Sequence, residues 1–399
     1  MLKNTLLFSF ILLFSCGNSA KPKVESQKLK VENIETKLEF KTGADNFELY
    51  LPLLKNKKVG IVTNQSGILT TKTHLVDFLL TEKVNIQKIY APEHGFRGTA
   101  DAGEVIKDGK DIKTGLPIIS LYGNNKKPKP EQLEGIGIMV FDLQDVGARF
   151  YTYISSLHYV MEACAENNIP LIVLDRPNPN GGIVDGPILE KEFTSFVGMH
   201  QIPVLHGMTI GEYAKMINGE KWLKNEIQCK LTVVPCENYN RTMFYDLLVK
   251  PSPNLPNAQA INLYASLCFF EGTNVSVGRG TEKQFQVYGS PFLNKGDFSF
   301  TPQPNEGAKD PTYNGKICYG EDLTQIKPVN KLELKWLIKA YNETTDKSKF
   351  FNAFFTKLAG TKKLQEQIEK GISETEIRAS WQKGLIDFKE MRKSYLIYE

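Results

Sequence analysis

Residues 136–142 read Ile-Gly-Ile-Met-Val-Phe-Asp, an almost unbroken apolar run that turns polar at its end. A short run of this kind fits a strand that is buried on both faces of a parallel sheet. We therefore expect residues 136–141 to form a strand inside such a sheet. Further strands are predicted at residues 57–63, 84–91, 117–122, 170–175 and 231–235.

Helical patterns separate these strands. Residues 73–80 carry Leu75 and Leu79 at helical spacing, and residues 152–167 form a second helical segment. Alternating strands and helices predict an α/β fold with a Rossmann-like, doubly wound N-terminal domain. We place this domain at residues 46–250.

The chain changes character at residues 251–257, Pro-Ser-Pro-Asn-Leu-Pro-Asn. Three prolines fix φ and remove backbone donors, so this segment is predicted to be stiff and extended. We expect it to lead into a smaller, mixed α+β C-terminal domain, residues 251–399. Thr209 and Glu212 have the spacing of a capping box. Helices are predicted at residues 209–218, 258–270, 332–341, 351–370 and 374–391.

The N-terminus has the form of an export signal. Lys3 precedes a short apolar stretch, residues 6–14, which is far shorter than the roughly 18 residues that span a bilayer. Residues 13–17, Leu-Phe-Ser-Cys-Gly, resemble the lipobox of bacterial lipoproteins, which implies cleavage before Cys16 and lipidation of its thiol. Residues 1–16 are therefore assigned to a lipoprotein signal peptide. The alternatives are a plain secretory signal and a cytosolic chain with an apolar start.

Residues 17–45 are rich in Lys, Glu, Ser and Thr, so we expect a flexible tether. A chain built in this way would be anchored by lipid to a bacterial membrane in the cell envelope. The sequence leaves open whether it faces the periplasm or the exterior.

Composition limits the partners. With 41% hydrophobic and 24% charged residues, the chain has the make-up of a soluble globular protein. Its formal charge of +4 is small for 399 residues, and no basic stripe of the nucleic-acid kind is present. Besides Cys16 there are five cysteines, whose spacing matches no zinc site. We expect most of them to be buried thiols, with at most two disulfides.

Polar residues follow four of the predicted strands. They lie at residues 64–65, 93–97, 142–149 and 175–180. In a doubly wound sheet the ligand crevice lies beyond the carboxyl ends of the strands. These clusters are therefore expected to converge on one edge of the sheet.

The cluster at residues 93–97, after the predicted strand 84–91, contains the side chains best suited to catalysis. Glu93, His94 and Arg97 bring a carboxylate, an imidazole and a guanidinium together between glycines. A carboxylate beside a cation can act as a proton donor or a nucleophile. A surface loop with a local ion pair is the structural alternative. The sequence has no His-Glu-x-x-His, so no metal site is expected here.

Two other segments carry ligand-binding chemistry. The segment 142–149, with Gln144 and Arg149, suits either hydrogen bonding to a polyhydroxylated ligand or an internal ion-pairing loop. Tyr151 and its aromatic neighbours would supply a flat surface for a sugar ring. Arg279, between Gly278 and Gly280, suits bidentate binding of a carboxylate or a surface ion pair.

Cofactor motifs are missing from the sequence. There is no Walker A motif, and Gly135-Ile136-Gly137 lacks a third glycine and precedes its strand, so no nucleotide cofactor is expected. An α/β esterase is excluded because no Gly-x-Ser-x-Gly elbow occurs at a strand–helix turn.

Seven long motifs in this order resemble the exo-β-N-acetylmuramidases, a family once classed as a domain of unknown function. They are GIVTNQSG (60–67), APEHGFRG (91–98), DLQDVGARFYTY (142–153), LDRPNPNGG (174–182), HGMTIGE (206–212), PSPNLPN (251–257) and CFFEGTNVSVGRGTE (268–282). The resemblance runs from about residue 47 to the C-terminus.

The resemblance implies removal of N-acetylmuramic acid from the non-reducing end of peptidoglycan fragments, in a cleft between a Rossmann-like domain and a smaller one. It places the family's central glutamate at Glu93. It also implies that the Gly-Arg-Gly-Thr-Glu loop and the residues around Glu93 hold the sugar.

Glycoside cleavage usually takes two carboxylates. We assign Glu93 as the acid, and the second group is Glu271, Asp145 or the acetamide of the substrate. A lipoprotein that binds muropeptides or other glycans without cleaving them is the alternative function. The predicted site comprises catalytic Glu93 and Glu271, and substrate-binding Asn64, His94, Arg97, Gln144, Asp145, Arg149, Tyr151, Asn178, Arg279 and Glu282.

Overall fold

The computed structural model describes residues 39–96 and 108–399. The predictions for Cys16, for Arg97 and for most of the tether therefore lie outside the described residues. Within the described part, none of the helices combines the length and the apolar character needed to cross a bilayer.

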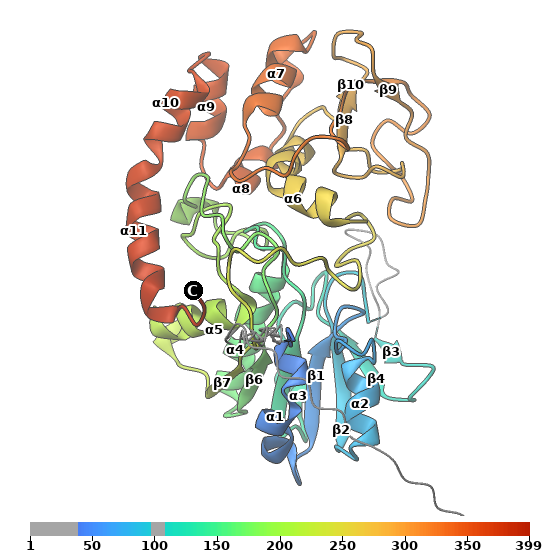
Figure 1. The fold of residues 1–399 in the computed structure, drawn as a ribbon, viewed down its shortest axis with the longest axis vertical. Coiled ribbons are helices and arrows are strands. Elements are labelled where there is room, and N and C mark those ends of the chain that lie inside the picture. Colours follow the sequence, from blue (N-terminus) through green and yellow to red (C-terminus); the bar gives the residue numbers. More distant parts are fainter. Residues whose placement is uncertain (1–38, 97–107) are drawn as a thin grey trace, which may run out of the picture. The chain divides into compact units, whose positions relative to one another are not determined.

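A seven-stranded sheet forms the base of the fold (Figure 1). Its strand order is β3-β4-β2-β1-β5-β6-β7, and every neighbouring pair is parallel except β3 and β4. This confirms the predicted α/β class and the predicted strands, and only the two-residue β3 was missed. The strands are β1 (Val59–Thr63), β2 (Ile86–Ala91), β3 (Gly109–Lys110), β4 (Pro117–Ser120), β5 (Ile138–Asp142), β6 (Leu171–Leu174) and β7 (Leu231–Val234).

The sheet is buried on both faces because alternate residues of each strand enter different cores. Val140 packs into one hydrophobic cluster and Phe141 into the other. Residues of α1 (Phe47–Leu54) and α2 (Leu75–Thr81) belong to the first cluster. The second cluster contains residues of α3 (Pro130–Leu133), α4 (Tyr153–Glu166) and α5 (Ile210–Gly219). The continuous apolar pattern of the strands thus follows from a doubly wound sheet.

The strand order reverses between β1 and β5, which are neighbours although they are far apart in the chain. Thr63 at the end of β1 pairs with Asp142 at the end of β5. The loops after β1 and β5 therefore leave the sheet side by side. This is the switch point at which doubly wound sheets bind ligands.

The C-terminal part contains a second, antiparallel sheet in the order β8-β10-β9. The prediction of a mixed α+β part is confirmed, although these strands were not predicted individually. The strands are β8 (Val287–Ser290), β9 (Ser299–Phe300) and β10 (Cys318–Asp322). The helices are α6 (Ala258–Leu267), α7 (Lys335–Glu343), α8 (Phe355–Ala359), α9 (Lys363–Glu369), α10 (Glu374–Ser380) and α11 (Gln382–Arg392).

Three predicted helices are interrupted, and one of them, the segment 374–391, is divided at Trp381 into α10 and α11. The segment 258–270 is α-helical only to Leu267 and continues as a 3-10 helix, Cys268–Gly272. The segment 351–370 is split into α8 and α9 at Gly360, whose φ of 72° is left-handed and ends a helix. The capping box of Thr209 and Glu212 is confirmed at the start of α5. Further 3-10 turns are Gly43–Asp45, Lys191–Phe193, Lys224–Glu226, Lys347–Lys349 and Lys393–Tyr395.

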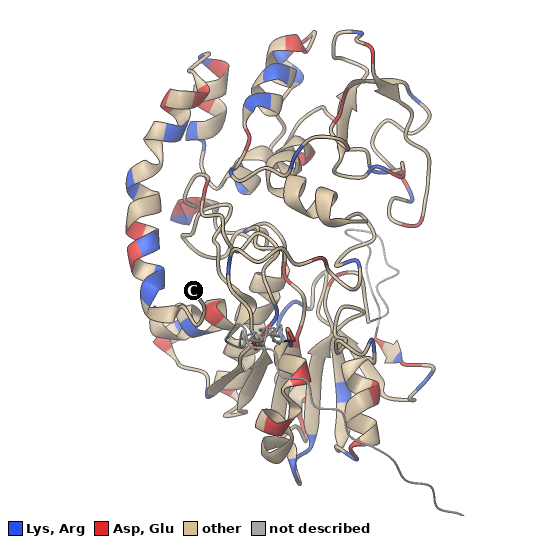
Figure 2. Cartoon of the chain, viewed as in Figure 1, with Lys and Arg blue, Asp and Glu red and all other residues tan. Residues whose placement is uncertain are grey.

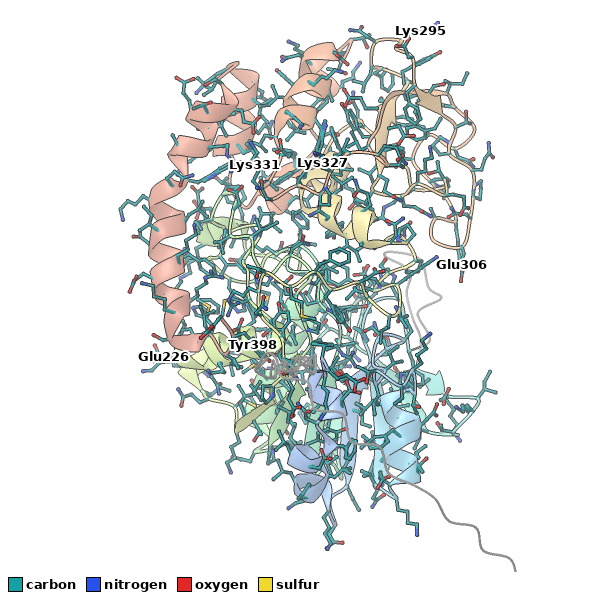
Figure 3. All side chains as sticks on the ribbon, viewed as in Figure 1. Glu226, Lys295, Glu306, Lys327, Lys331 and Tyr398 are labelled. Atoms are coloured by element: carbon teal, nitrogen blue, oxygen red, sulfur yellow. The ribbon has the colours of Figure 1, made fainter. Side chains whose placement is uncertain are left out.

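The C-terminus returns to the parallel sheet, where Tyr398 is labelled in Figure 3. The Tyr398 hydroxyl donates to Asp175 Oδ2 at 2.7 Å, just beyond the end of β6. Burial raises the pKa of Asp175 to about 6. The buried Glu212 carboxylate accepts from Arg241 and from the backbone of Ile397. The last residues therefore pack against the N-terminal sheet. The domain boundary predicted between residues 250 and 251 stays a prediction.

The five described cysteines are all free and buried, which confirms the expectation of buried thiols. Burial raises the pKa of each thiol, so the thiolate form is disfavoured. Charge is mixed over the surface: Figure 2 shows Lys and Arg interspersed with Asp and Glu along the C-terminal helices.

A buried histidine pair supports the junction of α4 and α5. His200 Nδ1 lies 2.8 Å from the Tyr213 hydroxyl, and His200 Nε2 lies 3.0 Å from His158 Nδ1. The His200 ring stacks on Trp222 at 4.3 Å. Glu162 lies 3.6 Å from the other nitrogen of His158. Burial lowers the pKa of both histidines, so the fold holds them in the neutral form.

This pair predicts a loss of stability in acid. Below pH 6.5, roughly the ordinary pKa of histidine, the unfolded chain takes up protons that the folded chain does not, so the free energy of unfolding falls as pH falls. For His200 the loss is at most about 2 kcal/mol at pH 5. Urea unfolding at pH 7 and pH 5 should show a smaller difference for His200→Gln than for the unchanged chain. An equal difference would contradict this account.

Candidate active site

A pocket of about 200 Å³ is lined by residues from both predicted domains. From the N-terminal part come the loop after β2, the residue Tyr122 beyond β4 and the start of α4. From the C-terminal part come residues 252, 254 and 255, α6 with the loop that follows it, and residues 354 and 358. Polar and aromatic residues of the pocket wall include Glu93, His94, Tyr122, Tyr151, Thr152, Tyr153, Tyr264, Cys268, Glu271 and Arg279.

Glu93 is presented by a sharp turn at the end of β2. The amide of Gly95 donates to the carbonyl of Pro92 at 3.1 Å. His94 takes a φ of 71°, a left-handed conformation that is uncommon for a residue other than glycine. Such conformations cluster at functional sites because the surrounding fold must hold them in place. The turn places both Glu93 and His94 in the pocket wall.

Two hydroxyl groups hold the Glu93 carboxylate. Tyr122 donates to Glu93 Oε1 at 2.8 Å, and Thr152 donates to Oε2 at 2.9 Å. Thr152 is the N-cap residue of α4, but it makes no capping bond to its own helix. Its hydroxyl is used by Glu93 instead. The carboxylate is therefore fixed from two separate elements, as proton transfer to a bound substrate requires.

Glu271 and Arg279 form a second charged group in the pocket. Arg279 Nε donates to Glu271 Oε1 at 2.6 Å. The guanidinium lies over the Phe285 ring, 5.1 Å from its centre. Arg279 Nη1 is buried and has no hydrogen-bond partner among the described residues. A guanidinium with one unused donor edge is suited to an anionic group of a ligand.

The Cys268 thiol also lines the pocket, 3.6 Å from Glu271 Oε2. Burial, followed by the charge of Glu271, raises the pKa of this thiol. Because the thiolate is the nucleophilic form, Cys268 is a weak donor here and has no nucleophilic role.

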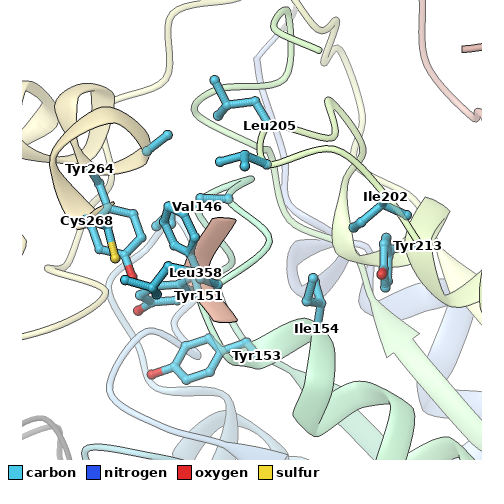
Figure 4. Packing of buried hydrophobic residues seen from close by; sticks show 14 of the residues in the cluster. Val146, Tyr151, Tyr153, Ile154, Ile202, Leu205, Tyr213, Tyr264, Cys268 and Leu358 are labelled. Carbon is cyan, nitrogen blue, oxygen red and sulfur yellow. The ribbon is translucent and has the colours of Figure 1, made fainter. Parts of the chain in front are cut away.

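Aromatic rings form the remaining wall, and Figure 4 shows several of them packed together. Tyr151 lies edge-on to Tyr153 at 4.8 Å and to Tyr264 at 5.9 Å. The Tyr151 hydroxyl donates to the carbonyl of Pro251 at 2.7 Å. Burial raises the pKa of all three tyrosines, which therefore stay neutral. The prediction of aromatic surface after Arg149 thus agrees with the pocket wall.

Five predicted site residues come together in this pocket, five others are buried elsewhere, and one lines a neighbouring pocket. The first group is Glu93, His94, Tyr151, Glu271 and Arg279. The second group, which is buried, is Asn64, Gln144, Asp145, Arg149 and Asn178. Glu282 lines a neighbouring pocket instead.

Arg149 is corrected from a sugar-binding residue to a structural one. Its side chain is fully buried, and its two Nη atoms donate to four backbone carbonyls at 2.7–2.9 Å. These carbonyls belong to Pro187, Ile202, Leu358 and Ala359, so Arg149 ties the loop after β5 to the C-terminal part.

Gln144 and Asp145 bond to their own surroundings. Gln144 Nε2 donates to the carbonyls of Asp145 and Pro177, at 2.8 Å and 2.7 Å. Asp145 Oδ2 accepts from the backbone of Gly147 at 2.7 Å. These bonds fit the internal-loop alternative for the segment, and Asp145 does not line the pocket that contains Glu93. Its role as the second carboxylate stays a prediction.

Asn64 and Asn178 also act as supports. Asn64 Nδ2 donates to the Tyr153 hydroxyl at 2.6 Å, so Asn64 acts on the pocket only through Tyr153. Asn178 Nδ2 donates to the carbonyl of Met208 at 2.9 Å. Both are buried and do not line the pocket, and their ligand-binding role stays a prediction.

Sequence reasoning missed Tyr122 and Thr152, the two groups that hold Glu93. Tyr122 follows β4, which is the neighbour of β2, so its place at the carboxyl edge was the available signal. Thr152 was treated only as the start of a helix. No group of three or more His, Cys, Asp or Glu side chains that could hold a metal occurs among the described residues.

The chain is similar to proteins of one family along most of its length. Two family models match it, described as exo-β-N-acetylmuramidase NamZ, N-terminal, over residues 59–259, and C-terminal, over residues 262–398. The peptidoglycan β-N-acetylmuramidase NamZ of Bacillus subtilis (strain 168) is 39% identical to this chain. The alignment is 406 residues long with its gaps and covers 95% of each chain.

Two crystal structures of DUF1343-family proteins from Bacteroides fragilis have the same fold. One matches with a TM-score of 0.83 and 43% identity, and the other with a TM-score of 0.76 and 30% identity. Each match covers 90% of this chain and 99% of the other. The chain therefore belongs to the NamZ family of exo-β-N-acetylmuramidases, which are glycoside hydrolases, and the resemblance seen in its motifs is confirmed.

Proposed function

We propose that this protein removes N-acetylmuramic acid from the non-reducing end of peptidoglycan fragments, in cell-wall turnover and recycling. The observation that carries the proposal is a pocket that joins Glu93, held by two hydroxyls, to the Glu271–Arg279 pair. Membership of the NamZ family supports the same activity.

In the proposed reaction Glu93 donates its proton to the glycosidic oxygen as the bond from that oxygen to the anomeric carbon breaks. A water molecule supplies the hydroxyl group to the anomeric carbon, and its proton passes to a base. Glycosidases use a carboxylate for this second role or to form a covalent intermediate. Glu271 fits either role because it lies in the same pocket. In the alternative, the acetamide oxygen of the substrate attacks the anomeric carbon, and the water that opens the resulting ring gives its proton to the deprotonated Glu93.

Arg279 is proposed to bind the lactyl carboxylate, the group that distinguishes N-acetylmuramic acid from N-acetylglucosamine. The unused Nη1 donor of this buried guanidinium supports the assignment. Arg279→Met should lower kcat/KM for a muramide roughly a hundredfold, mainly by raising KM, because a charge-assisted hydrogen bond to the lactyl carboxylate is lost. A loss confined to kcat, with KM unchanged, would show that Arg279 only positions Glu271.

The exo mode can be tested with a tetrasaccharide that alternates N-acetylmuramic acid and N-acetylglucosamine from its non-reducing end. Mass spectrometry over time should show free N-acetylmuramic acid and a trisaccharide first. A disaccharide as the first product would place the cut inside the chain and contradict the exo mode.

We also propose that the chain is a lipoprotein of the cell envelope, anchored through Cys16. The short apolar stretch and the lipobox-like residues 13–17 support this proposal. Mass spectrometry of the protein from membranes should find a diacylglyceryl group on Cys16, and Cys16→Ser should release the protein from the membrane fraction. A Cys16→Ser protein that stays membrane-bound would contradict the anchor.

A further inference from the structure

A second pocket, of about 280 Å³, adjoins the candidate active site. Its wall includes Lys250 and Pro253, while Ser252 and Asn254 of the same segment line the first pocket. The carbonyl of Pro251 accepts from the hydroxyl of Tyr151 at 2.7 Å and from Gln65 Nε2 at 3.3 Å. Tyr151 belongs to the first pocket and Gln65 to the second. One segment, residues 250–254, therefore separates the two pockets; it is bent and contains a turn closed by the bond from Leu255 N to Ser252 O, and not extended as predicted.

The second pocket is rich in hydrogen-bond acceptors without partners. Gln65, Gln284 and Asn305 line it, and the side-chain oxygen of each is buried and unpartnered among the described residues. Gln284 is only 7% exposed. Buried polar atoms are rarely left without a partner, and such exceptions point to a missing ligand or water.

The amide orientations follow from the neighbouring backbone. Gln65 Nε2 donates to the carbonyls of Lys250 and Pro251, at 3.2 Å and 3.3 Å. Asn305 Nδ2 donates to the carbonyl of Thr281 at 3.2 Å. An amide nitrogen bound to a carbonyl cannot exchange places with its oxygen without losing that bond. The oxygens of Gln65 and Asn305 are therefore kept as acceptors.

The charged groups of the wall are also mainly acceptors. Glu282 and Glu306 are exposed carboxylates, and Glu306 lies at the outer edge of the C-terminal part in Figure 3. Lys250 adds one cation. A matching ligand must offer several donors, such as hydroxyl groups and an amide N–H. The volume is close to the lower end for ligand sites, about 300 Å³, which fits a small ligand unit better than a bare ion.

We propose that this second pocket binds a sugar of the leaving chain, the part of the glycan that stays behind when the terminal N-acetylmuramic acid is released. This inference rests on the proposed function. In an exo-acting enzyme the substrate continues from the released sugar only toward its reducing end. A second sugar site must therefore bind the leaving chain. N-acetylglucosamine offers the hydroxyl and acetamide donors that the unpartnered oxygens accept. Glu282 then binds substrate, but away from the sugar that is released.

The test compares two substrates that differ only in the leaving group. Para-nitrophenyl β-N-acetylmuramide has no leaving sugar, whereas the disaccharide of N-acetylmuramic acid and N-acetylglucosamine has one. Gln284→Met removes one acceptor with little change in volume, and the Gln284 side chain makes no hydrogen bond to the described residues. The ratio of kcat/KM for the disaccharide to that for the nitrophenyl substrate should fall roughly three- to tenfold.

Gln303→Met is the matched control, because Gln303 is exposed and lies outside both pocket walls. The ratio should be the same for this control as for the unchanged protein. An unchanged ratio in Gln284→Met, or an equal loss on both substrates, would overturn the leaving-chain site. Failure of the unchanged protein to cleave either substrate would instead contradict the proposed function.

A binding measurement distinguishes failure of the leaving-chain site from failure of the proposed function. Calorimetric titration with a disaccharide that begins with N-acetylglucosamine, the form of the released chain, needs no turnover. Binding to the unchanged protein that weakens in Gln284→Met would support the site even without catalysis. Equal affinity in both proteins would overturn it.

Discussion

Glu93→Gln is expected to lower kcat on the disaccharide of N-acetylmuramic acid and N-acetylglucosamine at least about a thousandfold, because the general acid is removed while the shape of the side chain is kept. The loss should be smaller on the nitrophenyl muramide, since nitrophenolate leaves readily without a proton. This difference between the substrates identifies Glu93 as the acid and separates this role from that of a nucleophile or base.

The measurement is kcat for both substrates, with the melting temperature as a check on folding. The amide oxygen that Glu93→Gln introduces can still accept one hydrogen bond, from either Tyr122 or Thr152, so the variant should fold. Glu131→Gln on α3 is a matched control, because Glu131 is exposed and outside the pocket. Near-normal turnover of the disaccharide by Glu93→Gln would remove Glu93 from the reaction. Equal losses on both substrates would assign it another catalytic role.

Arg149→Met is expected to lower the free energy of unfolding by about 3–5 kcal/mol, a cost typical of breaking a buried charged network. Four backbone carbonyls would lose their donors, and Met cannot replace them. Burial lowers the pKa of Arg149 to about 9, so the guanidinium is still charged at neutral pH and binds these carbonyls as a cation.

Urea unfolding monitored by fluorescence measures this loss. The exposed Lys389→Met on α11 serves as a control, and a change within about 0.5 kcal/mol is expected for it. If Arg149 instead bound the sugar, Arg149→Met would keep its stability and raise KM. That result would reverse the structural assignment.

The parallel sheet could be predicted because its central strands β1, β5 and β6 are apolar runs buried on both faces. The run at residues 138–142 and its neighbours carry this signal themselves. The second sheet could not be predicted in the same way. Its strands have four, two and five residues, and β9 is half exposed, so neither length nor alternation marks them.

The site was predicted in part for a different reason. Sequence motifs located Glu93, Glu271 and Arg279, which share one pocket. They also pointed to Gln144 and Arg149, whose donors are taken by backbone carbonyls. A polar residue after a strand can serve a ligand or the neighbouring loops, and only the fold shows which carbonyls are within its reach.

The central claim is tested most directly by hydrolysis of para-nitrophenyl β-N-acetylmuramide by the chain from Lys21 onward, beside the matching N-acetylglucosaminide. The proposed function predicts release of nitrophenol from the muramide only. Release from neither substrate by a folded protein that still binds peptidoglycan fragments would contradict it and identify a protein that binds glycans without cleaving them.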